Sequence, residues 1–211
     1  MTDRIVLWSG ILGPLVFLAT VVIGGMADPA YSHLGNAVSE LGQRGAPLAR
    51  EVAVGFTISA LLSGVFGWGA IRIAGSGETA LRTAGRLLML YAVFAILPGT
   101  VFPMDPFGAD VTFAGVMHIV MVVLGAVALI ALLLVGSRAL RDSHPWFSIY
   151  SRLSIAAMLA GGVLSAVVGF YGIPLLGAAE RLTQAAYLLW MVVFAALLLR
   201  RRGSAAGVQP I

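Results

Sequence analysis

Six long apolar segments, separated by shorter stretches rich in polar residues, glycine and proline, divide the chain. An α-helix needs about 20 apolar residues to cross the hydrocarbon core of a bilayer, and each segment is close to that length. The pattern predicts an all-α integral membrane protein, a six-helix bundle in a single membrane domain. The spans are predicted near residues 5–26, 49–74, 83–102, 112–136, 148–171 and 182–200, and residues 201–211 are expected to form a flexible tail.

Composition agrees with membrane insertion and narrows the chemistry. Hydrophobic residues make up 60% of the 211 residues and charged residues only 10%, whereas a soluble domain carries about 25% charged residues. Because the chain has no cysteine, disulfides, iron–sulfur clusters and thiolate zinc sites are excluded. The basic residues are all arginine and are dispersed at predicted helix ends, so no nucleic acid is expected as a partner.

The arginines are divided unequally between the two predicted sides of the membrane. Cytoplasmic loops carry an excess of basic residues, so the side with ten of the 13 basic residues is expected to be cytoplasmic, with both termini on it. Heavy use of Ala, Gly and Arg is typical of a GC-rich bacterium, which places the protein in a bacterial inner membrane. The ten residues are Arg4, Arg72, Arg82, Arg86, Arg138, Arg141, Arg152, Arg200, Arg201 and Arg202.

The first loop on the predicted outer side is long and carries several polar side chains. If residues 34–41 form a short helix closed by Gly42, Leu34, Val38 and Leu41 share one face. An alternative interpretation is an interfacial amphipathic helix whose polar face only meets water. The candidate functional residues of this loop are Tyr31, His33, Asn36, Ser39 and Glu40, of which His33, Asn36 and Glu40 share the face opposite the leucines.

Four further candidates map to the same outer side. Asp105 lies between two prolines in the second outer loop, where a turn-capping role is the alternative. His118 lies six residues into the fourth span, where an ionisable group is costly and usually faces the bundle interior with a partner. Glu180 is expected at a helix N-terminus, where the dipole favours an acid, and Arg181 beside it is available for an acid or a lipid phosphate.

These motifs resemble those of a prokaryotic six-span membrane family, catalogued as domain of unknown function nine hundred and ninety-eight. The resemblance covers about residues 5–200 and implies a six-helix bundle, without an established activity. That family often carries a His-Gly-x-x-His pattern in its fourth span, but this chain has alanine at the first position. The matching stretches are Tyr31-Ser32-x-Leu34, Ser39-Glu40-Leu41-Gly42, Phe102-Pro103-x-Asp105, Ala114-Gly115-Val116-Met117-His118 and Glu180-Arg181.

The leading hypothesis is a membrane-embedded enzyme acting on a lipid or isoprenoid-like apolar substrate at the outer leaflet. Its candidate catalytic residues are Glu40, Asp105, His118 and Glu180. Glu40 or Asp105 would act as general acid or base with a pKa raised by burial, and His118 would orient the substrate or relay a proton. Tyr31, His33, Asn36, Ser39 and Arg181 would bind the substrate.

Three alternatives remain open at this point. A metal-dependent hydrolase would need at least three protein ligands, which His118, His33 and one acid would supply, but the sequence does not provide a recognisable full ligand set. The chain would otherwise be a non-catalytic lipid-binding or partner-regulating subunit, in which a Glu40–Arg44 pair and similar contacts merely lock the loops together. A small proton-coupled transporter is also considered, although the cytoplasmic halves of the spans contain almost no polar side chains.

Overall fold

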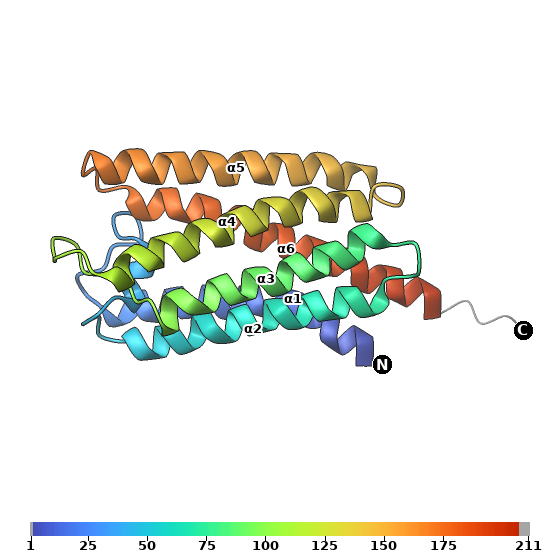
Figure 1. Ribbon diagram of the computed structural model, residues 1–211, viewed down its shortest axis with the longest axis horizontal. Helices are drawn as coiled ribbons and strands as arrows, with labels where there is room; N and C mark the ends of the chain where they lie inside the picture. The colour runs from blue at the N-terminus through green and yellow to red at the C-terminus, as the bar shows by residue number, and fades with distance from the viewer. Residues whose placement is uncertain (1, 207–211) are drawn as a thin grey trace, which may run out of the picture.

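The structure is a computed structural model that describes residues 2–206, and it consists of long helices joined by short loops (Figure 1). Six of these helices are long and apolar enough to cross a membrane, which confirms the all-α bundle of six candidate spans. Helices that follow one another in the chain run in opposite directions, so α1 begins and α6 ends at the same end of the bundle. The elements are α1 (Thr2–Ala27), η1 (Val38–Gly42), α2 (Ala49–Ile73), α3 (Thr79–Thr100), α4 (Phe113–Ala139), α5 (Pro145–Phe170) and α6 (Leu176–Ala206).

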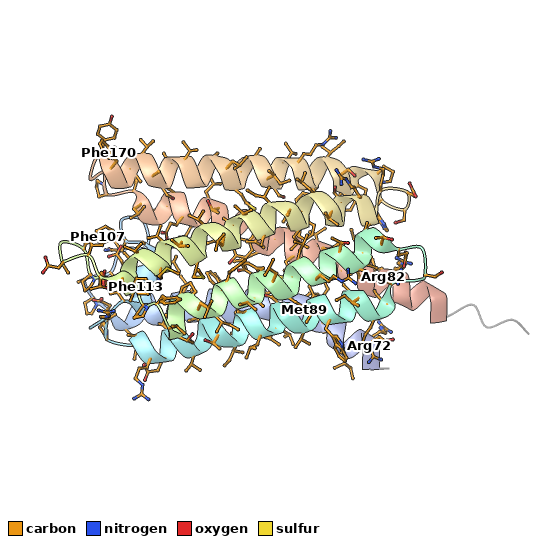
Figure 2. The ribbon with its side chains drawn as sticks, in the orientation of Figure 1. Arg72, Arg82, Met89, Phe107, Phe113 and Phe170 are labelled. Atoms are coloured by element: carbon orange, nitrogen blue, oxygen red, sulfur yellow. The ribbon has the colours of Figure 1, made fainter. Side chains whose placement is uncertain are left out.

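The two ends of the bundle, here called the terminal end and the roof end, carry different segments of the chain. The terminal end carries the start of α1, the end of α6 and the loops 74–78 and 140–144; the roof end carries the loops 28–48, 101–112 and 171–175. The side chains of Arg72 and Arg82 lie at the terminal end, whereas Phe107, Phe113 and Phe170 lie at the roof end (Figure 2). The predicted separation of arginines from the candidate functional residues is therefore a separation between the two ends of one bundle.

Two predicted boundaries are wrong. The sixth helix begins at Leu176, six residues before the predicted start, so Glu180 and Arg181 lie inside α6 rather than at its N-terminus. The uninterrupted apolar stretch begins at Leu182 because Glu180 and Arg181 precede it, but the helix itself already includes Leu176–Ala179. The expected tail is also shorter, since residues 201–206 continue α6, and residues 207–211 lie outside the described part of the chain.

The terminal half of the bundle is filled by aromatic and leucine side chains. Phe147 stacks on Phe194 with 5.8 Å between ring centroids, and Trp190 stacks on Phe194 at 4.8 Å. The Trp190 Nε1–H donates to Ser151 Oγ at 2.8 Å, so the one polar atom of this ring is satisfied inside the core. All four of the large side chains Phe66, Phe147, Trp190 and Phe194 are fully buried.

Candidate functional site

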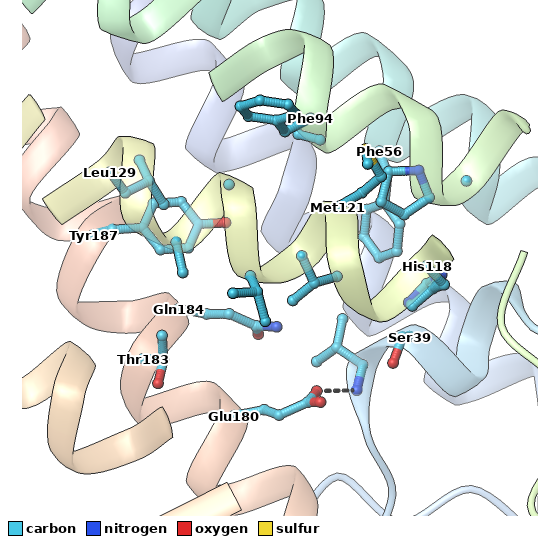
Figure 3. A pocket seen from close by; sticks show the side chains of 18 of the residues that line it. Ser39, Phe56, Phe94, His118, Met121, Leu129, Glu180, Thr183, Gln184 and Tyr187 are labelled. Carbon is cyan, nitrogen blue, oxygen red and sulfur yellow. Dashed lines mark hydrogen bonds between the residues drawn. The ribbon is translucent and has the colours of Figure 1, made fainter. Parts of the chain in front are cut away.

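A cavity of about 570 Å³ lies in the roof half of the bundle (Figure 3). All six long helices and η1 contribute to its wall, and its size is within the ~300–1,000 Å³ typical of sites for small molecules. Most of the lining is apolar, including Phe17, Phe56, Phe94 and Met121. The polar lining residues are Ser39, Ser59, Tyr91, His118, Ser165, Glu180, Thr183, Gln184 and Tyr187.

The cavity has a solid floor toward the terminal end. The rings of Tyr91 and Tyr187 meet there, with 5.9 Å between their centroids. Leu129 and Met158 line the cavity and also belong to the buried cluster that contains Trp190. The aromatic core of the terminal half therefore closes the cavity on that side.

The side of the cavity opens between α4 and α5. These helices are joined at the terminal end and diverge toward the roof end (Figure 1). The lining residues of the cavity that are exposed all lie on these two helices, namely Ile119, Val122 and Val123 of α4 and Gly162 and Ala166 of α5. This lateral mouth, defined by those five residues, would face the lipid of a surrounding bilayer rather than water.

The roof over the cavity is a turn followed by a short 3-10 helix, so the predicted helix over residues 34–41 is wrong. The Asn36 side chain folds back to accept the Ser32 N–H at 2.8 Å, and such local bonding competes with helix formation. The 3-10 helix starts only at Val38. The three apolar residues expected on one face are therefore separated, since Val38 and Leu41 are buried whereas Leu34, in the turn, is 63% exposed.

Arg181 joins the roof to α6 through four hydrogen bonds. Its Nη1 donates to the carbonyl oxygens of Asn36 at 3.2 Å and Gly177 at 3.0 Å. Its Nη2 donates to the Tyr31 hydroxyl at 2.7 Å and lies 2.9 Å from His33 Nδ1, which must accept because a guanidinium only donates. Burial raises the pKa of the Tyr31 hydroxyl, and the bond from Arg181 opposes that rise.

Glu40 is occupied within the roof itself. Its Oε2 accepts from Asn36 Nδ2 at 2.7 Å, and its Oε1 accepts from the Ala37 N–H at 2.5 Å. Glu40 does not line the cavity. The pairing of Glu40 with Arg44 considered from the sequence is not formed, because Arg44 Nη1 lies 3.7 Å from Asp105 Oδ1 instead.

Glu180 connects α6 to the roof and also lines the cavity (Figure 3). Its Oε2 accepts the backbone N–H of Val38, the first residue of η1, at 2.8 Å. No ion pair among the described side chains of residues 3–201 includes this carboxyl, since the neighbouring Arg181 is directed to the roof. Glu180 is thus an acidic group held by one oxygen at the edge of an apolar space.

Asp105 caps the loop that enters α4. Its Oδ2 accepts the Thr112 N–H and its Oδ1 accepts the Thr112 hydroxyl, both at 2.8 Å. The backbone N–H of Thr112, then its hydroxyl, lower the pKa of Asp105, so the expectation of a raised pKa for this acid is wrong. A Cβ at Gly115, three residues before His118, would strike the Asp105 carboxyl, which explains why this position is glycine. Asp105 does not line the cavity.

His118 is buried and faces the interior, as its position in the fourth span predicts. Its partner is not an acid: Nδ1 lies 2.9 Å from the carbonyl oxygen of Phe102 and therefore carries the proton. The carbonyl of Pro98 also lies close to the ring. His118 thus satisfies backbone acceptors at the end of α3 while its ring forms part of the cavity wall.

Most of the predicted site residues fall into two groups at the roof end, and Ser39 belongs to neither. Tyr31, His33, Asn36, Glu40 and Arg181 form one connected network, and Glu180 holds the same loop through the backbone N–H of Val38. Asp105 and His118 hold the turn between α3 and α4. Of the predicted residues, only Ser39, His118 and Glu180 line the cavity.

The sequence analysis missed Gln184 and Thr183, which line the cavity one turn below Glu180. Their signal was present in the chain, because a glutamine inside an apolar span is costly unless it faces other protein groups or a ligand. Within residues 2–206, no set of three or more His, Asp or Glu side chains is arranged to hold a metal ion.

The fold and composition define a multi-pass membrane protein. A family model described as Protein of unknown function (DUF998) matches residues 11–197, and the chain belongs to this family. Comparison with curated proteins and with solved structures gave no match.

Proposed function

We propose that the protein binds an apolar or amphipathic molecule of the membrane in the roof cavity. The observation that carries this proposal is the combination of an apolar cavity of about 570 Å³ with a lateral mouth between α4 and α5. A ligand that enters through this mouth would come from the bilayer. The arginine excess at the terminal end supports an orientation with that end in the cytoplasm of a bacterium and the roof at the outer leaflet.

A substitution at the mouth tests this function directly. A Cβ at Gly162 would meet no heavy atom within 4 Å, so Gly162→Phe is expected to fold and to fill the mouth. The matched control is Val163→Phe, because Val163 is 65% exposed and does not line the cavity. Native mass spectrometry of protein extracted into nanodiscs should show a co-purified ligand in wild type and Val163→Phe, and loss of it in Gly162→Phe. Identical spectra for all three proteins would contradict binding in this cavity.

Catalysis on the bound molecule is the second candidate function, and Glu180 is the observation that favours it. Its carboxyl lies in the cavity wall, whereas Glu40 and Asp105 are occupied elsewhere. Glu180 would act as the proton donor or acceptor for an isoprenoid-like substrate. Incubation of a bacterial lipid extract with wild type should yield a new product by liquid chromatography and mass spectrometry, and Glu180→Gln should abolish it. Equal product formation by the variant would rule out this role.

Two other functions are less well supported. A transport pathway needs polar groups at both ends, but the terminal half is filled by buried Phe66, Phe147, Trp190 and Phe194. A subunit that only regulates a partner needs no internal space, whereas this bundle keeps one beneath a hydrogen-bonded roof. The cavity therefore favours a ligand over either a pathway or a purely structural role.

A further inference from the structure

The cavity contains a negative group but no arginine, and this difference bears on the ligand's head group. Of the residues that line it, Glu180 is the one acid, and none is arginine. The guanidinium of the neighbouring Arg181 is directed away to Asn36, Tyr31 and His33 in the roof and to the Gly177 carbonyl of its own helix. An anionic head placed in the cavity would meet a carboxylate without a compensating positive side chain.

The remaining polar groups near Glu180 are uncharged and available. Within residues 2–206, neither the Gln184 amide nor the Ser39 hydroxyl forms a side-chain hydrogen bond. Figure 3 shows Ser39, Glu180 and Gln184 around the same part of the cavity. Polar groups that are withdrawn from water need hydrogen-bond partners. The Glu180 carboxylate offers hydrogen-bond acceptors to a ligand, and the Gln184 amide and the Ser39 hydroxyl offer neutral donors.

His118 does not reverse this balance. Its protonated Nδ1 is used by the Phe102 carbonyl, and the Pro98 carbonyl lies close to the same ring. Because its Nδ1–H is already bonded to the Phe102 carbonyl, the imidazole does not offer this N–H to a head group in the cavity.

We infer that the ligand is a molecule with a long apolar chain whose head donates hydrogen bonds and carries no negative charge, as in an alcohol or an amine. This inference rests on the proposed function, because it assigns a chemical class to the occupant of the same cavity. Glu180 accepts a hydrogen bond from the head, Gln184 and Ser39 complete its hydrogen bonding, and the apolar wall takes the chain. Phosphate esters and fatty acids are excluded by charge.

Four chain-matched probes test the assignment: hexadecanol, hexadecylamine, palmitate and hexadecyl phosphate. Each is titrated into wild-type protein in phosphatidylcholine nanodiscs, and bound probe is counted by native mass spectrometry. The alcohol and the amine are expected to bind at least about tenfold more tightly than the two anions. Glu180→Gln should weaken amine binding about tenfold or more and leave alcohol binding within about threefold, whereas Gln184→Leu should weaken both.

The outcomes separate this inference from the proposed function. If all four probes bind equally and Gly162→Phe blocks them all, the cavity is a binding site and the head-group assignment is wrong. If either anion binds as tightly as the alcohol, or if Glu180→Gln changes none of the affinities, the assignment is also overturned. If no probe binds to wild type, the head-group assignment is wrong. If Gly162→Phe also retains the molecules that co-purify with wild type, the proposed binding in this cavity is wrong as well. The ranking in wild type is decisive even if a variant does not fold.

Discussion

The terminal half and the roof half of this bundle are built from the same six helices but are filled differently. The terminal half is filled by side chains, with stacked rings at Phe147, Trp190 and Phe194. The roof half encloses a cavity and is closed by polar contacts between Arg181, Glu180 and the first roof loop. Buried packing is therefore concentrated at one end of the bundle, and the internal space lies at the other.

The largest effect is expected from the core of the terminal half. Trp190→Ala would remove a fully buried ring together with its bond to Ser151, and loss of a buried aromatic side chain costs about 3–5 kcal/mol. The free energy of unfolding in mixed micelles should fall by that amount. The control is Trp68→Ala, since Trp68 is 43% exposed and should lose much less. Equal losses would show that neither the burial of Trp190 nor its bond to Ser151 stabilises the fold.

Gly177→Val would test the fit between α6 and the roof. A side chain at Gly177 would collide with the carbonyl oxygens of Asn36 and His33, and because these atoms are backbone they cannot rotate away. Overpacking of this kind costs ~1–3 kcal/mol, and we expect the upper part of that range. Hydrogen exchange should increase over residues 31–43 and stay unchanged in α2. Gly162→Val, at a position with open space, should leave both measurements near wild type.

Arg181→Leu is expected to have an intermediate effect confined to the roof. The substitution removes the four contacts that join Tyr31, His33, Asn36 and Gly177 to one guanidinium. Since the group is only half-buried, we expect a loss of about 1–2 kcal/mol. Hydrogen exchange should increase over residues 31–43, while exchange in the part of α6 around Trp190 should change little. A uniform increase in exchange would argue that the two halves unfold together.

The smallest effect is expected from pH at the turn between α3 and α4. Hydrogen bonds from Thr112 hold the pKa of Asp105 below its usual range, so the unfolded chain binds the proton more tightly than the folded chain. The stabilisation is therefore present above the unfolded pKa of about 3.9 and is lost as pH falls through the lower folded pKa. The Tm of wild type should fall more steeply below about pH 4 than that of Asp105→Asn. Asp110→Asn, an exposed control in the same loop, should follow wild type.

The spans and the interior position of His118 were predictable because both follow from the cost of placing polar groups in hydrocarbon. The partner of His118 could not be predicted, because the position of the Phe102 carbonyl depends on the C-terminal turn of α3, where the N–H groups of Val101 and Phe102 both donate to the Leu97 carbonyl. The spacing of apolar residues also could not predict the structure of the roof, because the Asn36 side chain accepts the Ser32 N–H and a turn forms there instead of a helix. That local choice decides that Glu180, rather than Glu40, reaches the cavity.

The lateral mouth between α4 and α5 also determines how occupancy must be measured. A molecule that exchanges through this opening never has to dissolve in water, so its effective concentration is its mole fraction in one leaflet. Even a modest intrinsic affinity would then keep the protein saturated by an abundant lipid. Dilution of the buffer would leave occupancy unchanged, whereas dilution of the surrounding bilayer with inert lipid would empty the protein.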